Sequence, residues 1–123
     1  MENSENTSKA DGAAEKAGAQ AQMRKGVLEL CILSILSQGD AYPTEIIDKL
    51  KGTKLVVVEG TLYPLLTRLK NSGLLGYRWE ESTSGPPRKY YKLTKSGAQA
   101  LKSQIADWET FEAAVRKILG DST

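Results

Sequence analysis

Residues 95–119 carry an apolar stripe that constrains the fold more strongly than any other feature of this sequence. Large apolar side chains recur there at spacings of three and four, which predicts one amphipathic helix. Thr94, just before them, is a favourable N-cap for its start. The stripe consists of Leu101, Ile105, Trp108, Phe111 or Glu112, Val115, and Ile118 or Leu119. Because no other segment is left to cover it, this helix is expected to pair with a second copy of the chain.

Three segments upstream also predict helices. Residues 24–37 read RKGVLELCILSILS and leave almost no polar face, so this helix is expected to be buried on more than one side. Cys31 within it is interpreted as a small buried hydrophobe rather than a reactive thiol. Residues 42–51 predict a short second helix, in which Pro43 suits the first turn. Residues 59–72 predict a third helix with leucines at helical spacing and a polar opposite face.

A β-hairpin is predicted between the third helix and the last one. Residues 75–81 alternate apolar and polar side chains, which is typical of a half-buried strand. Residues 82–87 are predicted as a turn and residues 88–94 as the returning strand. Residues 54–58 are expected to form a small strand or an extended entry into the third helix. Cross-strand packing, rather than base stacking, is the expected role of Tyr77, Trp79 and Tyr91.

The first 22 residues differ in character from the rest of the chain. Residues 1–22 contain no Leu, Ile, Val or aromatic residue and carry a net charge of −2. A segment that cannot bury apolar surface does not offset the entropy lost on ordering, so a disordered tail is predicted. The predicted organisation is therefore a tail over residues 1–22, a helix-and-hairpin domain over residues 23–94 and a dimerisation helix over residues 95–119.

Composition excludes several kinds of site and location. The 123 residues include no histidine and one cysteine, which excludes histidine-based catalytic and metal sites and multi-cysteine zinc sites. Glu80 and Glu81 are neighbours on a predicted strand, so their carboxylates point to opposite faces and cannot act as a catalytic pair. We predict that the chain is not an enzyme and holds no metal or cofactor. Because no apolar run suits a membrane span or a signal core, a cytoplasmic location is expected.

Positive charge is concentrated in one part of the sequence. Residues 66–95 contain seven Lys and Arg against two acids, a net charge of +5, whereas the whole chain carries only +2. A local basic patch is typical of a protein that binds a polyanion, and a solvated charged surface is the alternative interpretation.

The order of the predicted elements indicates where such a polyanion would bind. Three helices followed by a hairpin form the layout of a winged helix-turn-helix domain, a mostly α fold whose third helix enters the DNA major groove. The N-terminal end of that helix, at Gly60, suits contact with phosphate. The candidates on its polar face are Thr61, Tyr63, Thr67, Arg68 and Lys70. For Arg68, an ion pair with an acid on a neighbouring helix is the alternative. On the hairpin, Arg88 and Lys89 are expected to contact phosphates.

Two functions from different classes fit this layout. The leading hypothesis is a dimeric, sequence-specific DNA-binding regulator. The alternative is a winged-helix module that binds proteins and has lost DNA binding. Acids or exposed apolar residues on the third helix and hairpin would favour that alternative, whereas the sequence has cations and hydroxyls there.

Five motifs resemble those of the PadR family of bacterial transcriptional regulators. They are Lys25-Gly26-Val27-Leu28-Glu29-Leu30, Glu59-Gly60-Thr61-Leu62-Tyr63-Pro64-Leu65-Leu66-Thr67-Arg68-Leu69, Asn71-Ser72-Gly73-Leu74-Leu75, Gly85-Pro86-Pro87-Arg88-Lys89-Tyr90-Tyr91 and Leu93-Thr94-Lys95-Ser96-Gly97. In this order and spacing they are specific to the family. The single final helix resembles that of a small subfamily.

The resemblance implies a homodimer that binds a pseudo-palindromic operator in double-stranded DNA, usually as a repressor. It implies that Tyr63 lies against the DNA backbone and that Gly85, Arg88 and Lys89 belong to the DNA-contacting wing. Where many members have His-Gly-Tyr-Glu, this chain reads Ala41-Tyr42-Pro43-Thr44-Glu45. Tyr42 and Thr44 are the residues of this segment expected to contact DNA.

The resemblance also implies a ligand site on the final helix. In the small subfamily, a tryptophan there lines a pore at the dimer interface, where planar aromatic compounds stack. Trp108, after Asp107, occupies the matching place. The residues alone favour the alternative that Trp108 simply packs at the interface.

Overall fold

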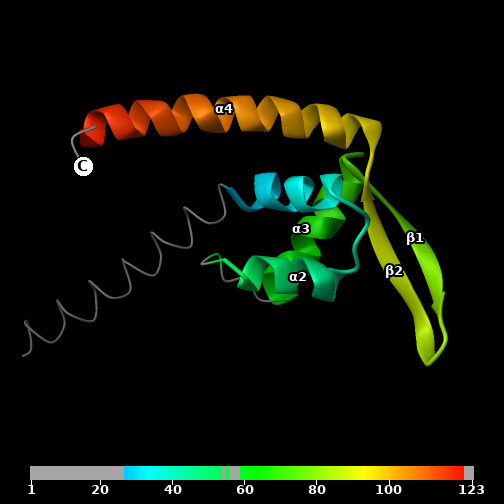
Figure 1. Ribbon diagram of the computed structural model, residues 1–123. Helices are drawn as coiled ribbons and strands as arrows, with labels where there is room; N and C mark the ends of the chain where they lie inside the picture. Colours follow the sequence, from blue (N-terminus) through cyan, green and yellow to red (C-terminus); the bar gives the residue numbers. More distant parts are fainter. Residues whose placement is uncertain (1–26, 54, 56–58, 121–123) are drawn as a thin grey trace, which may run out of the picture.

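The computed structural model describes residues 27–53, 55 and 59–120. In chain order, a helix over residues 27–37 is followed by α2 (Pro43–Lys51), α3 (Glu59–Asn71), the strands β1 (Leu75–Ser82) and β2 (Gly85–Leu93), and α4 (Lys95–Leu119). Figure 1 shows the hairpin extending from the shorter helices and α4 running along another side of them. The predicted fold, mostly α with a small β-hairpin, is confirmed. The predicted tail and, apart from Leu55, the predicted segment 54–58 lie outside the described residues.

The core lies between the first three helices and the base of the hairpin. α2 and α3 each bury one face, as the spacing of their apolar residues predicts. The first helix, expected to be buried on more than one side, has Leu30, Cys31 and Ile35 only partly buried in the single chain. The buried helical side chains are Leu28, Ile32, Leu33, Leu36, Ile46, Ile47, Leu50, Leu62, Leu66 and Leu69. Burying each of them stabilises the fold by about 1.5–3 kcal/mol, so this cluster fixes the relative placement of the three helices. Leu65, expected in the same stripe, is only partly buried.

Backbone conformation at Gly73 ends α3 and directs the chain into β1. Gly73 has a φ of +81°, a left-handed conformation that residues with a side chain rarely adopt. The N–H of Leu74 donates to the carbonyl of Leu69 at 3.0 Å, and the N–H of Gly73 donates to that of Lys70 at 3.0 Å. These two hydrogen bonds form a Schellman motif, which satisfies the last carbonyls of the helix.

The start of α4 is tied to the same turn. The N–H of Gly97 donates to Oγ1 of Thr94 at 3.0 Å, which confirms the predicted N-cap. The Thr94 hydroxyl donates in turn to the carbonyl of Gly73 at 2.6 Å. Gly97 is buried against Leu74, where a side chain would overlap the Leu74 carbonyl. The beginning of α4 is therefore held rigidly against the end of α3.

The hairpin is longer, and its turn shorter, than the sequence predicts. β1 and β2 pair in antiparallel register from Leu75 opposite Leu93 to Ser82 opposite Gly85, which leaves a turn of two residues. The predicted turn over residues 82–87 is wrong, because Pro86 and Pro87 belong to β2. The register shifts at this point, so that Glu81 alone opposes both prolines. A bulge suits prolines because they have no N–H to donate to the ladder.

A backbone bridge ties the hairpin to the turn that precedes α2. The N–H of Ala41 donates to the carbonyl of Tyr91 at 3.1 Å, and the N–H of Tyr91 donates to the carbonyl of Ala41 at 2.8 Å. Ala41 and Tyr91 are both buried. The middle of β2 is therefore fixed against the helical unit, while the bulged end of the hairpin projects from it (Figure 1).

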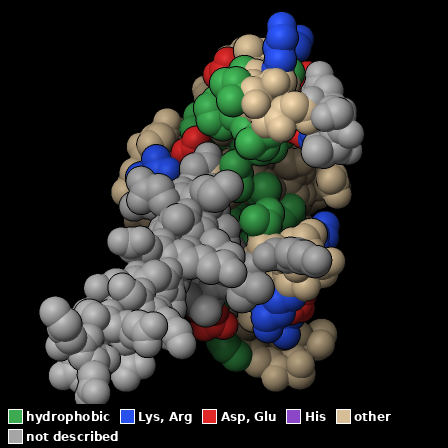
Figure 2. All heavy atoms as spheres, turned by 90° about the vertical axis from the view of Figure 1, so that its left-hand side faces the viewer, with side chains coloured by type: hydrophobic (Ala, Val, Ile, Leu, Met, Phe, Trp, Pro, Cys, Tyr) green, Lys and Arg blue, Asp and Glu red, His purple; other side chains and the backbone are tan. Residues whose placement is uncertain are grey.

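Most of the apolar stripe on α4 is exposed in the single chain. Leu101 is an exception, because it is 8% exposed and packs into the core, contrary to the expectation that the whole stripe lacks cover within the chain. The exposed members are Ile105, Trp108, Phe111, Val115, Ile118 and Leu119. Figure 2 views the molecule from the side where α4 ends and shows hydrophobic side chains gathered on that face. No helix within the described ranges is long and apolar enough to cross a membrane.

Candidate nucleic-acid interface

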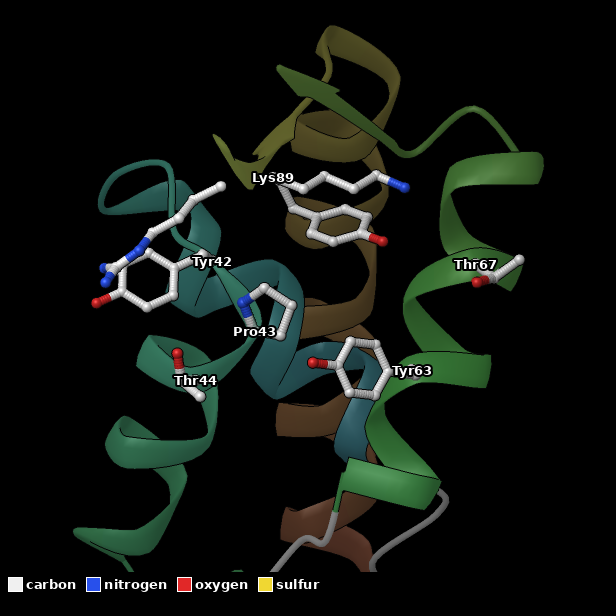
Figure 3. A pocket seen from close by; sticks show the side chains of 8 residues that line it. Tyr42, Pro43, Thr44, Tyr63, Thr67 and Lys89 are labelled. Carbon is white, nitrogen blue, oxygen red and sulfur yellow. The ribbon is translucent and has the colours of Figure 1, made fainter. Parts of the chain in front are cut away.

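A hollow of about 590 Å³ lies where α2, α3 and the hairpin meet (Figure 3). It is lined by Tyr42, Pro43, Thr44, Tyr63, Thr67, Arg88, Lys89 and Tyr91. Six of these eight are among the residues that the sequence predicts as DNA contacts. Because they come from segments up to 47 positions apart, counted from Tyr42 to Lys89, the fold is needed to bring them together.

The start of α2 forms one wall of the hollow. Tyr42 precedes the helix in an extended conformation, and its backbone N–H donates to Oε1 of Glu45 at 3.1 Å. Pro43 occupies the first turn, where its missing N–H costs no helical hydrogen bond. This local structure holds the Tyr42 ring and the exposed Thr44 hydroxyl at the rim of the hollow.

The opposite wall is the exposed face of α3. Tyr63 and Thr67 are one helical turn apart and therefore share a face, and the Tyr63 side chain is 45% exposed. Figure 3 shows the Tyr63 ring reaching from α3 toward Pro43. Pro64 follows Tyr63 without interrupting the helix. Because Pro64 is the sixth residue of α3, its missing N–H removes one helical hydrogen bond, the one to the carbonyl of Gly60 in the first turn.

Two cations of β2 close the hollow from the side of the hairpin. The Arg88 guanidinium lies over the Tyr42 ring, 4.8 Å from its centroid. The Lys89 ammonium lies 4.1 Å from the centroid of Tyr77 and 5.3 Å from that of Tyr91. Such contacts between cations and aromatic rings hold both charges in place without neutralising them. Arg88 and Lys89 therefore border the hollow with their positive charge available.

The charge and chemistry of the lining suit an anion. The eight residues include two cations and no carboxylate. They also carry five side-chain hydroxyls, those of Tyr42, Thr44, Tyr63, Thr67 and the buried Tyr91. Hydroxyls and cations are the groups that proteins use to contact the phosphates of DNA. Among the described residues there is no cluster of acids and cysteine that could hold a metal ion.

The remaining predicted residues lie outside the hollow. Gly60 and Thr61 are in the first turn of α3, and Gly85 begins β2 beside the hairpin turn. The Lys70 ammonium lies 5.1 Å from the centroid of Tyr77. Arg68 donates from Nη2 to Oε1 of Glu29 at 3.1 Å, on the neighbouring helix. The structure thus has the ion pair that was the alternative for Arg68.

Residues that the sequence did not predict as DNA contacts also take part in this surface. Pro43 and Tyr91 line the hollow. Tyr91 is 4% exposed, and its ring packs against Tyr77 at 6.4 Å between centroids, which confirms the predicted cross-strand packing. Trp79 is 62% exposed, although its ring contacts Tyr77 edge-on at 6.5 Å. The exposure of Trp79 could not be predicted from the sequence. The alternation of apolar and polar residues shows which side chains share a face of the strand, but not how deeply that face is buried.

A second hollow, of about 340 Å³, lies on the side of the molecule that carries α4. It is lined by Leu30, Cys31, Ser34, Ile35, Lys49, Leu50, Thr53, Leu55 and Ile105. Burial raises the pKa of the Cys31 thiol, so the thiol stays protonated at neutral pH. This agrees with the interpretation of Cys31 as an apolar packing residue rather than a nucleophile.

Comparison with known proteins assigns the family. The model of the PadR-like family of transcriptional regulators matches residues 32–103, more than half of the chain. A PadR-like transcription factor from Bacteroides fragilis is 55% identical, over 82% of this chain and 98% of its own, with a TM-score of 0.70. A PadR family regulator from Eggerthella lenta is 31% identical over 90% and 97%, with a TM-score of 0.80.

A third similar structure includes DNA. Bacillus subtilis PadR, solved in complex with operator DNA, is 28% identical over 64% of this chain and 45% of its own, with a TM-score of 0.60. The chain described here belongs to the PadR-like family of transcriptional regulators. That family consists of transcriptional regulators and not of enzymes, in agreement with the prediction from composition.

Proposed function

We propose that this chain is a homodimeric transcriptional repressor that binds a pseudo-palindromic operator through the hollow between α2, α3 and β2. The observation that carries the proposal is the composition of that hollow, with two cations and several hydroxyls but no acid among its lining residues. The operator complex of Bacillus subtilis PadR supports it, because that protein is 28% identical to this chain over the 64% of this chain that matches. A repressor of bacterial operators would act in the cytoplasm.

The proposed roles follow from where each group lies. The exposed face of α3 would enter the major groove, where Thr67 can reach base edges. Tyr63, Arg88 and Lys89 would contact the DNA backbone, with Thr44 beside them at the start of α2. Backbone contacts fix the register of the protein on the duplex, and base contacts select the sequence.

The same surface argues against the protein-interaction alternative. A surface that binds protein usually has aromatic or aliphatic side chains at its centre and excludes charge there. The tyrosines of the hollow would suit such a surface, but Arg88 and Lys89 place two positive charges beside them, and no carboxylate in the lining balances these charges.

Recovery of genomic DNA bound to the purified chain tests the proposed function. The proposal predicts that the recovered fragments share one pseudo-palindromic sequence, with half-sites spaced by about one helical turn. Fragments without a common sequence would contradict it. The same experiment names the operator and the genes beside it.

The proposed dimer rests on α4. Its exposed apolar side chains run from Ile105 to Leu119, and Ile105 also borders the second hollow. Pairing across a two-fold axis would stabilise the dimer by about 1.5–3 kcal/mol for each such side chain that becomes fully buried. The Gln104 amide donates to Oε2 of Glu29 at 2.8 Å, which holds α4 beside the first helix. The apolar face presented to a partner would therefore include parts of both helices.

We further propose that Trp108 binds planar aromatic compounds at this dimer interface. The Trp108 side chain is 39% exposed in the single chain, so two-fold pairing could leave a slot between the two rings. Asp107 and Glu112 are nearby on α4 and would favour a cationic ligand. Such a ligand would release the operator only if it bound better to the form of the dimer that does not fit DNA.

Trp108→Ala is expected to lower the affinity for planar cationic dyes about tenfold or more, while the dimer still binds DNA. Dye fluorescence titrations, with sedimentation of the same sample, measure both properties. Phe111→Ala is the matched control, because Phe111 is 63% exposed on the same helix and should leave dye binding nearly unchanged. A Trp108→Ala dimer that keeps its dye affinity would contradict the stacking role, and one that dissociates would indicate plain packing.

A further inference from the structure

A ladder of side chains connects the hairpin to the turn before α2. Nε of Arg78, on β1, donates to Oδ2 of Asp40 at 3.2 Å, and its Nη1 donates to Oε2 of Glu80 at 2.7 Å. The same guanidinium lies 4.8 Å from the centroid of the Tyr90 ring. Asp40 is outside the hairpin, 38 residues before Arg78. Arg78 is therefore the point at which the hairpin is linked to that turn by an ion pair.

The ladder continues from Tyr90 to the proposed DNA-binding surface. The Tyr90 ring contacts the Tyr42 ring edge-on at 5.2 Å between centroids. At the far end of this series of contacts, the Arg88 guanidinium lies 4.8 Å from the centroid of the Tyr42 ring. Arg78, Tyr90 and Arg88 share one face of the hairpin, since Arg78 pairs with Tyr90 and Arg88 comes two residues before Tyr90 on β2. The order is Asp40, Arg78, Tyr90, Tyr42 and Arg88.

We propose that Arg78, clasped by Asp40, is a positioning residue that sets the angle of the hairpin relative to α2 and α3, and so holds Arg88 and Lys89 where the DNA backbone passes. This inference rests on the proposed function and extends it to residues that do not themselves contact DNA. Arg78 is not expected to contact DNA as Arg88 does, because the carboxylates of Asp40 and Glu80 already accept hydrogen bonds from the Arg78 guanidinium. A guanidinium suits the task because its planar fork can bind two carboxylates at once.

The clasp complements the backbone bridge at Ala41 and Tyr91. That bridge joins Tyr91 of β2 to Ala41, and the buried Leu75 holds the base of β1 in the core. Arg78 and Asp40 add an attachment one residue nearer the hairpin turn, since Tyr91 pairs with Tyr77 and Arg78 follows Tyr77. Arg78 lies on the opposite face of β1 from Tyr77, so the clasp would restrain the hairpin from tilting about its base. Without the clasp, the hairpin would hold the orientation that binds DNA for only a fraction of the time, and the affinity would fall by that fraction.

Asp40→Asn tests the proposal because a positioning role and simple electrostatics predict opposite changes in the affinity for operator DNA. Removing an acid close to bound DNA should strengthen binding electrostatically, and it would also release one donor of Arg78, whose other contact is with Glu80. We expect instead that Asp40→Asn weakens operator binding about three- to tenfold, with an unchanged salt dependence. Arg78→Lys, which keeps the charge but not the fork, should weaken binding by a similar factor. The double variant should be no weaker than either single variant, because both break the same link.

Glu81→Gln is the matched control, since it also removes an exposed acid from this region. It should bind as tightly as the wild type or more tightly. Tighter binding by Asp40→Asn, or full affinity in Arg78→Lys, would overturn the positioning role. Thermal melting should be nearly unchanged in all these variants, because the Arg78 and Asp40 side chains are 46% and 36% exposed and such pairs add little to stability.

A measurement without DNA separates this proposal from the proposed function. Spin labels at Thr83→Cys, in the hairpin turn, and Asp48→Cys, on α2, are placed in a Cys31→Ala background and diluted with unlabelled chain. The distribution of distances between the labels should widen in Asp40→Asn and stay narrow in Glu81→Gln. Equal distributions would reject the clasp even if the chain binds DNA. If the distribution widens but the wild type does not bind DNA, the clasp stands and the proposed function fails.

Discussion

Affinity for the operator should fall by about four orders of magnitude when monovalent salt rises from 50 to 200 mM. Neutralised phosphates release their counterions, so each contact adds about −0.9 to the slope of log affinity against log salt. Residues 66–95 carry a net charge of +5 in each protomer. If each protomer contacts about four phosphates, the dimer contacts about eight, and the expected slope is about −7.

Titrations of a labelled duplex at four or more salt concentrations measure this slope. A single-stranded oligonucleotide of the same sequence serves as a control for non-specific attraction. A slope near zero would contradict DNA binding through the cationic surface. A slope of about −3 to −4 would indicate that only one protomer engages the duplex.

Replacing both Arg88 and Lys89 by Ala should weaken DNA binding on the order of a hundredfold or more, and by nearly the same factor for every DNA sequence. The double variant removes four cations from a dimer, so the salt slope should become shallower by about three to four. Lys102→Ala with Lys117→Ala is the matched control, since it removes the same charge from exposed positions on α4. Competition titrations with operator variants provide the measurement.

Thr67→Ala should have the opposite pattern, with a modest loss of affinity and a change in the preferred operator, because Thr67 lies where base edges can be reached. Arg68 was also a candidate DNA contact on this helix. Because it forms an ion pair with Glu29, Arg68→Ala should leave the preferred operator unchanged. Our assignment of roles would be reversed if the wing variant changed the sequence preference and Thr67→Ala did not.

The helices, and the residues at which α3 ends and α4 begins, could be predicted because local signals define them. Apolar spacing gives the buried faces of α2 and α3, Gly73 ends α3 in a left-handed conformation, and the Thr94 hydroxyl caps α4. The hairpin turn was mispredicted because proline usually indicates a turn, whereas a bulge accommodates Pro86 and Pro87 within β2.

The candidate site could be predicted in its residues but not in its geometry. Tyr63 and Thr67 share a face by helical spacing alone, and their polar character is visible in the sequence. The ion pair between Arg68 and Glu29 joins residues 39 positions apart, and the contact between Arg78 and Asp40 joins residues 38 apart. Such contacts depend on the packing of separate elements, which no local pattern encodes.

Protection of a single cysteine by DNA tests most directly whether the hollow faces the operator. In a Cys31→Ala background, Thr44→Cys places a thiol at the rim of the hollow, and Thr110→Cys places one on α4 by the same substitution. Both parent residues are exposed, so a maleimide should label both variants readily in the free protein. Saturating operator duplex is expected to slow the labelling of Thr44→Cys by about tenfold or more, as for a thiol that is accessible only when DNA dissociates. Labelling of Thr110→Cys should not change. Equal labelling rates of Thr44→Cys with and without bound operator would contradict the proposed interface.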